Sequence, residues 1–180
     1  STPFSLRNWK LSDGSATATI NNDFVLQPDS FVIICPNAAV AEFSKFGNTI
    51  GVNNFPSLNN DRDLIILYSP EGRIIHAIEY YNTWYQNDVK RDGGWSLEMV
   101  DIGNPCSGTN NWKASINPAG GTPGRKNSID GINPDDTPPA LLRTYTTGNN
   151  TVVAVFDEPL DSISAASPTH FSIDKNIWHP

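Results

Sequence analysis

Turn-forming residues interrupt this chain throughout and leave room only for short elements of regular structure. Its 180 residues include 13 Gly and 14 Pro. Between these breaks lie short runs rich in β-branched and aromatic residues, which favour β-strands. The runs are 5–11, 17–20, 31–35, 64–68, 73–80, 95–100 and 112–115. Short strands with a turn about every 10 residues predict an all-β sandwich or barrel.

Two local patterns refine this prediction. The runs 64–68 and 73–80 are separated by the turn sequence Ser-Pro-Glu-Gly, which predicts a hairpin. Only 38–46 has helical spacing, with Val40 and Phe43 on one stripe, so we expect one short helix.

Charge and hydropathy exclude two classes of partner. The net charge is −7 and the longest basic run is Arg125-Lys126, whereas binding to a phosphate backbone needs clustered Lys and Arg. We therefore expect no nucleic acid partner. The longest apolar run, 31–35, is far shorter than the ~18 residues of a membrane span, so no transmembrane segment is predicted.

The composition changes at Asn117. Residues 117–139 are rich in Gly, Pro, Asn and Asp and lack periodicity, as in a linker or a tail held against a domain. Alternating patterns return after Ala140. The segment 140–180 is too short to bury a core of its own without further support.

Several motifs, taken together, resemble the lamin-tail domain in its bacterial, cell-surface form. They occur in the expected order at 6–13, 26–34, 55–80, 92–101, 104–115 and 120–128. The resemblance covers about residues 5–128 and implies an Ig-like antiparallel β-sandwich. The later segment 152–161 resembles the opening of a bacterial Ig-like module.

The resemblance has two departures. The family opens with two further strands that are not found before Ser5, and His76 stands where the family carries an Asp. The chain is thus expected to comprise a lamin-tail-like sandwich (1–129), a linker (130–139) and a third segment (140–180). That segment is either a partial Ig-like module or a set of strands that complete the first sandwich. We hypothesise the second, which requires 152–156 to pair with a strand of residues 5–115, because proteins avoid exposed sheet edges.

The segment 92–115 concentrates residues that build either an active site or a structural clamp. Asp92-Gly93-Gly94 predicts a turn, and Glu98 lies in the middle of the following strand. As a catalytic group, Glu98 would be a general acid or base. As a structural group, it would accept hydrogen bonds from loop N–H groups or pair with a nearby basic residue. We favour the structural interpretation, with Trp95 and Trp112 packed in or over the core.

The two cysteines, Cys35 and Cys106, have structural roles in this interpretation, either as a disulfide or as buried thiols. Their spacing, with three scattered His residues, does not favour zinc. No cofactor is expected. Asp61 and Asp63 offer hard oxygen ligands that suit Ca²⁺, but they could equally begin a hairpin strand.

The loop 80–88 is rich in aromatic residues. Tyr81, Trp84 and Tyr85 lie beside Asn and Asp residues and could stack on sugar rings or contact a protein. The alternative is that Tyr80 and Trp84 turn inward to cap the core. Sugar binding by this loop requires Trp84 and Tyr85 to be exposed.

The resemblance implies a non-catalytic tethering or protein-binding module at the cell surface or outside the cell. Its partner would be a protein or a surface glycan. The alternatives are a carbohydrate-binding module that uses the loop 80–88 and, third, a glycoside-type hydrolase with Glu98 as the acid.

Overall fold

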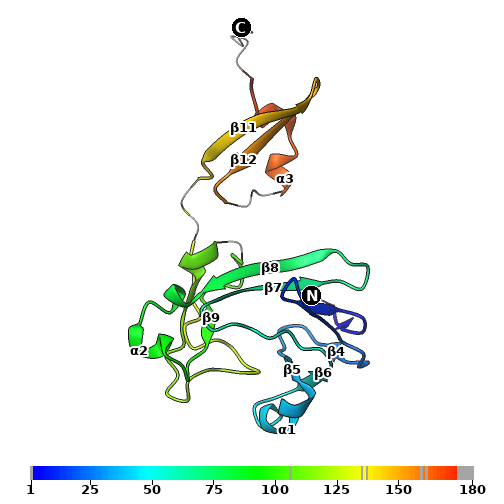
Figure 1. The fold of residues 1–180 in the computed structure, drawn as a ribbon, viewed down its shortest axis with the longest axis vertical. Helices are drawn as coiled ribbons and strands as arrows, with labels where there is room; N and C mark the ends of the chain where they lie inside the picture. The colour runs from blue at the N-terminus through cyan, green and yellow to red at the C-terminus, as the bar shows by residue number, and fades with distance from the viewer. Residues whose placement is uncertain are drawn as a thin grey trace. The chain divides into compact units, whose positions relative to one another are not determined.

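The structure is a computed structural model that describes residues 2–105, 107–134, 136, 138–158, 160 and 162–173. The chain divides into two compact units, Ser1–Asn133 and Pro134–Pro180 (Figure 1). We call them unit 1 and unit 2. The fold is all-β, as the spacing of turn residues predicted, and its helical segments are single turns.

A four-stranded antiparallel sheet is the largest element of unit 1. Its order is β3 (Thr17–Thr19), β2 (Lys10–Ser12), β7 (Arg62–Tyr68) and β8 (Ile74–Tyr81). β7 and β8 form the predicted hairpin, with Ile65 opposite Ile78. The hairpin turn is closed where the backbone N–H of Ser69 donates to the carbonyl of Arg73 at 2.9 Å.

Three two-stranded sheets complete unit 1. β1 (Phe4–Ser5) pairs with β4 (Val25–Leu26), and β9 (Leu97–Met99) pairs with β10 (Trp112–Ala114), both antiparallel. β5 (Ile33–Pro36) pairs with β6 (Thr49–Val52) in parallel, which departs from a purely antiparallel sandwich.

The helix expected over 38–46 is shorter in the structure. It consists of η1 (Asn37–Ala39) and α1 (Val40–Phe43), which connect β5 to β6. The connection packs closely on β6 at Gly51. A Cβ atom there would lie 2.4 Å from Asn37 Oδ1 and 2.6 Å from Val40 Cγ2. Glycine is therefore needed for this contact. Because a glycine weakens the strand pattern of Thr49–Val52, β6 was not among the strands predicted from the sequence.

The strand expected over 5–11 is wrong as a single element. Its ends belong to two sheets, β1 and β2, and the chain turns between them at Asn8, which has a left-handed φ of 65°. Asn tolerates this conformation better than most residues. The turn directs Leu6 inward, where it is only 6% exposed.

The core of unit 1 lies between the four-stranded sheet and the small sheets. Its buried residues come from several strands and their flanks, and they are Leu6, Ala18, Ile20, Ile50 and Val52. Partly buried side chains pack around them, among them Trp9, Phe24, Ile34 and Phe55. The small sheets are thus joined to the large one by side-chain packing.

Unit 2 contains an antiparallel hairpin of β11 (Leu141–Gly148) and β12 (Thr151–Phe156). It is followed by α3 (Ser162–Ala165) and η4 (Pro168–His170). Because β12 has its partner, β11, within unit 2, the pairing does not support the hypothesis that it completes the first sandwich. No helix in the described parts of the chain is long and apolar enough to cross a membrane.

Candidate functional site

Glu98 lies in the middle of β9 and is only 3% exposed. Its Oε1 accepts a hydrogen bond from the Thr122 hydroxyl at 2.6 Å. Its Oε2 accepts two bonds from Ser128, one from the backbone N–H at 2.8 Å and one from the hydroxyl at 2.6 Å. Both carboxylate oxygens therefore accept hydrogen bonds inside the protein, and one of the donors is a loop N–H.

The environment of Glu98 favours its ionised form. Burial raises the pKa of the carboxyl, but hydrogen bonds from Ser128, Thr122 and Ser115 together lower it below its ordinary value. A general acid must carry a proton at the working pH, so a carboxyl with a lowered pKa is poorly suited to that role. The geometry favours a structural role for Glu98.

Residues 115–133, which we call the strap, contact β9 and the residues that follow it. Asn127 Nδ2 donates to the carbonyl of Met99 at 2.9 Å, and the N–H of Gly131 donates to the carbonyl of Val100 at 2.9 Å. The N–H of Asn133 donates to Asp101 Oδ2 at 2.9 Å. With the bonds of Ser128 to Glu98, these contacts hold the strap against β9 and the residues that follow it.

Trp95, which was expected to pack in or over the core, lies beside Lys90 and the strap instead of among the core residues. Its ring is half-buried, and the Lys90 ammonium lies 4.2 Å from the ring centroid. Lys90 Nζ also donates to the carbonyl of Ser115 at 2.5 Å, at the start of the strap. Lys90 thus links Trp95 to the strap.

Trp84 is buried, unlike a residue that stacks on a ligand. It belongs to η2 (Asn82–Tyr85) and is 9% exposed. Its ring centroid lies 6.1 Å from that of Tyr81 and 6.4 Å from that of Trp112. The three rings form a packed cluster, so the form of sugar binding that needs an exposed Trp84 does not fit this loop.

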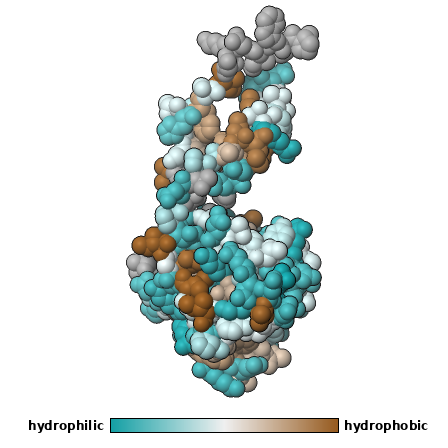
Figure 2. Space-filling model, turned by 90° about the vertical axis from the view of Figure 1, so that its left-hand side faces the viewer, coloured by the Kyte–Doolittle hydropathy of each residue, from teal (hydrophilic) through white to brown (hydrophobic). Residues whose placement is uncertain are grey.

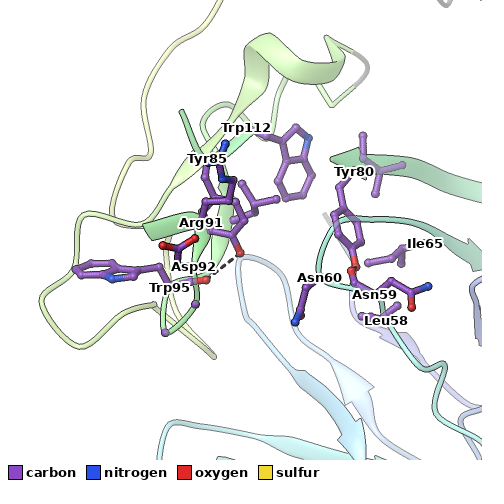
Figure 3. A pocket seen from close by; sticks show the side chains of 14 residues that line it. Leu58, Asn59, Asn60, Ile65, Tyr80, Tyr85, Arg91, Asp92, Trp95 and Trp112 are labelled. Atoms are coloured by element: carbon purple, nitrogen blue, oxygen red, sulfur yellow. Dashed lines mark hydrogen bonds between the residues drawn. The ribbon is translucent and has the colours of Figure 1, made fainter. Parts of the chain in front are cut away.

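A pocket of about 340 Å³ opens beside this cluster (Figure 3). Its volume lies within the usual ~300–1,000 Å³ of small-molecule sites. Figure 3 shows Tyr80 and Tyr85 on opposite sides of the pocket and the ring of Trp95 pointing away from it. The lining residues come from the hairpin and its approach, from η2 and α2 (Asp88–Arg91), and from β9 and β10. They are Leu58, Asn59, Asn60, Ile65, Ile78, Tyr80, Tyr85, Arg91, Asp92, Gly93, Gly94, Trp95, Leu97 and Trp112.

Two tyrosine hydroxyls fix the walls of the pocket. The Tyr85 hydroxyl donates to the carbonyl of Trp95 at 2.9 Å. The Tyr80 hydroxyl donates to the carbonyl of Asn59. Burial raises the pKa of both phenols, and in Tyr80 the charge of Asp63 and the nearby Tyr85 add to the effect. Both hydroxyls therefore stay protonated as donors at neutral pH.

Of the three aromatic residues predicted to bind a ligand, only Tyr85 lines this pocket. Tyr81 and Trp84 pack against each other in the aromatic cluster and do not line the pocket. Sequence reasoning did not associate Asn60 and Trp112 with Tyr85 as one site, and it considered Tyr80 only as a residue of the same loop that could turn inward. Asn60 and Trp112 come from segments far from Tyr85 in the chain, and the pairing of β7 with β8 and of β9 with β10 brings those segments together.

Asp61 and Asp63, whose oxygens could suit Ca²⁺ but for which no cofactor was expected, support the loop before β7. Asp63 Oδ2 accepts hydrogen bonds from the backbone N–H and side-chain amide of Asn59 at 2.8 and 2.9 Å. Asp61 Oδ1 accepts one from Asn82 Nδ2 at 3.1 Å. Within the described ranges, no group of three or more His, Cys, Asp or Glu residues could hold a metal ion.

Cys35 lies in β5 as a buried free thiol, and burial raises its pKa above the ordinary value. Cys106 lies outside the described residues.

A scan against protein-family models, a search of curated proteins and a search of solved structures each found no match to this chain.

Proposed function

We propose that unit 1 is a non-catalytic interaction module of the lamin-tail, Ig-like type, and that it works at the cell surface or outside the cell. The motifs quoted above support the family, and the all-β fold is compatible with it. Fold and resemblance do not by themselves fix a function, so the proposal depends on the site.

The observation that carries the proposal is that the buried carboxylate has a structural role, whereas the pocket is open to a ligand. Both oxygens of the buried carboxylate, Glu98, accept hydrogen bonds from the strap. The pocket, which Glu98 does not line, is walled by Tyr80 and Tyr85, whose hydroxyls are held by backbone carbonyls. This arrangement suits recognition of a partner, because pre-formed walls reduce the entropy lost on binding.

Co-sedimentation with a bacterial cell-envelope fraction tests the proposal. We expect the full chain to sediment with the fraction and Tyr85→Ala to lose most of that binding. Tyr145→Ala is the matched control, because Tyr145 is an exposed tyrosine of unit 2 (46% exposed) that does not line the pocket. Equal binding by Tyr85→Ala and the wild type would contradict the proposal.

The non-catalytic part has its own test. We expect the wild type and Glu98→Gln to release no reducing sugar from the same fraction. Release that requires Glu98 would instead establish a glycoside hydrolase.

A further inference from the structure

We propose that the pocket between Tyr80 and Tyr85 binds a carbohydrate, with the ring of one sugar unit held between the two phenol rings. The inference rests on the proposed function and deepens it, because it names the chemical class that the interaction module recognises.

Two phenol rings form facing walls of the pocket. Tyr80 comes from β8, and Tyr85 comes from the end of η2, so the two rings approach the pocket from opposite sides (Figure 3). Each hydroxyl is already bonded to a backbone carbonyl, of Asn59 and Trp95 respectively. The rings are therefore held in place. A sugar ring carries C–H groups on its faces, which an aromatic face contacts favourably while the sugar hydroxyls point outward.

The pocket lining also carries polar and charged side chains. The side-chain amide of Asn60 and the carboxylate of Asp92 lie on the pocket, and neither makes a hydrogen bond or ion pair with any described residue. Among the described residues, the Arg91 guanidinium is paired only with the exposed Asp88, at 3.0 Å. Amide, carboxylate and guanidinium groups can each bond adjacent hydroxyls of a sugar.

A pair of sheet residues and two glycines complete the lining of the pocket. Ile65 and Ile78 are directly paired on β7 and β8, so the base is rigid sheet. Gly93 and Gly94 border the pocket, and a Cβ atom at either would meet no atom within 4 Å. The backbone at this border is thus open to a ligand.

The combination of aromatic walls and unpaired polar groups favours a sugar over an apolar peptide side chain. An apolar group in the pocket would cover Asn60 and Asp92 without pairing them, and an unpaired buried polar group is costly. A ligand with many hydroxyls pairs these groups and still covers the aromatic faces. Sites with mixed linings of this kind obtain orientation from a few polar groups.

The test is a titration of the full 180-residue chain with soluble oligosaccharides of cellulose, chitin, mannan and xylan, followed by calorimetry and tryptophan fluorescence. Trp112 lines the pocket and reports occupancy. We expect one of these ligands to bind, Tyr85→Ala to weaken binding about tenfold or more, and Asn60→Ala to weaken it about threefold to tenfold.

Asn21→Ala is the matched control, since Asn21 is exposed and does not line the pocket, and we expect its affinity to be unchanged. Thermal unfolding of each variant shows whether it folds. If Tyr85→Ala does not fold, Asn60→Ala decides the result. Binding that neither pocket variant weakens would overturn the inference.

Failure of this inference and failure of the proposed function give different results. If no oligosaccharide binds but the chain still sediments with the envelope fraction through Tyr85, the carbohydrate inference is wrong and the interaction module stands. Binding of an apolar peptide without any oligosaccharide has the same meaning. Loss of both kinds of binding overturns both proposals.

Discussion

At the scale of a single residue, Glu98 holds unit 1 together through its charge. A buried carboxylate is stabilising only when hydrogen bonds replace its lost hydration. Here the bonds come from Thr122 and Ser128, which belong to the strap rather than to the strand that carries Glu98. One side chain therefore connects β9 to the strap, although β10 lies between these two segments in the sequence.

Replacement of Glu98 by Gln should destabilise the protein by about 1–3 kcal/mol, because an amide NH₂ would face a hydroxyl or N–H donor and leave it unpaired. The folded pKa of Glu98 is lowered, so its stabilising effect is present at neutral pH. That effect is lost as the pH falls below ~4.3 and through the folded pKa. Urea unfolding from pH 7 to pH 3 measures this, and Glu98→Gln should lose less stability than the wild type over that range. The exposed Glu42, changed to Gln, is the control and should behave as the wild type does.

Tyr80 and Tyr85 give a second prediction at this scale. Their pKa values are raised by burial, so both phenols should ionise above the ordinary value of ~10 in an ultraviolet absorbance titration. The stability that they contribute is complete below pH ~10 and is lost as the pH rises through the folded pKa values. Tyr85→Phe should remove one of the two late transitions and cost about 1 kcal/mol through its lost hydrogen bond to Trp95. Two unchanged late transitions in this variant would refute the assignment.

At the scale of elements, close approaches of the backbone decide how the small sheets attach. β6 lies against η1 and α1 because Gly51 has no side chain. The strap lies against β9 because Asn127 and Gly131 bond carbonyls that a sheet neighbour would otherwise take. Neither contact has the regular periodicity that marks a strand pair in the sequence.

Gly51→Ala should destabilise unit 1 by about 1–3 kcal/mol, because the new Cβ atom would overlap Asn37 and Val40 and force them apart. Denaturant unfolding of the full chain measures the change. Gly148→Ala serves as the control, since a Cβ atom there meets nothing within 4 Å. A Gly51→Ala variant as stable as the control would show that this contact can relax freely.

At the scale of the whole molecule, unit 1 ends where the strap ends. Asn133, the last residue of unit 1, bonds Asp101 through its backbone N–H, and Asn133 Nδ2 donates to the carbonyl of Asn110 at 3.3 Å. Asp130, Gly131 and Asn133, from the segment that was expected to begin a linker at residue 130, thus bond other residues of unit 1.

Two fragments test this boundary. We expect residues 1–133 to unfold cooperatively on their own, because unit 1 contains the core and every strap contact described above. Residues 1–126 lack Ser128 and its bonds to Glu98, and we expect them to be less stable by about 3 kcal/mol or more, since a buried charge loses its partners. Circular dichroism during heating compares the two. Equal stability would show that the strap is not part of the folded unit.

The amino-acid sequence by itself determined the all-β class and the β7–β8 hairpin. These follow from local properties, namely turn residues and alternation, which act over a few residues. Only the tertiary structure decided that Trp84 is buried, that Tyr85 faces Tyr80, and that Asn60 and Trp112 line the same pocket.

Tertiary packing also decides which apolar side chains remain exposed. Figure 2 shows apolar side chains in separate patches among polar ones on one face of the molecule. Exposed apolar residues such as Val89 and Ile102, at 78% and 75%, carry no mark in the sequence that separates them from core positions. Whether an aromatic or apolar side chain is buried depends on which distant segments pack over it, and those contacts arise only when the sheets assemble.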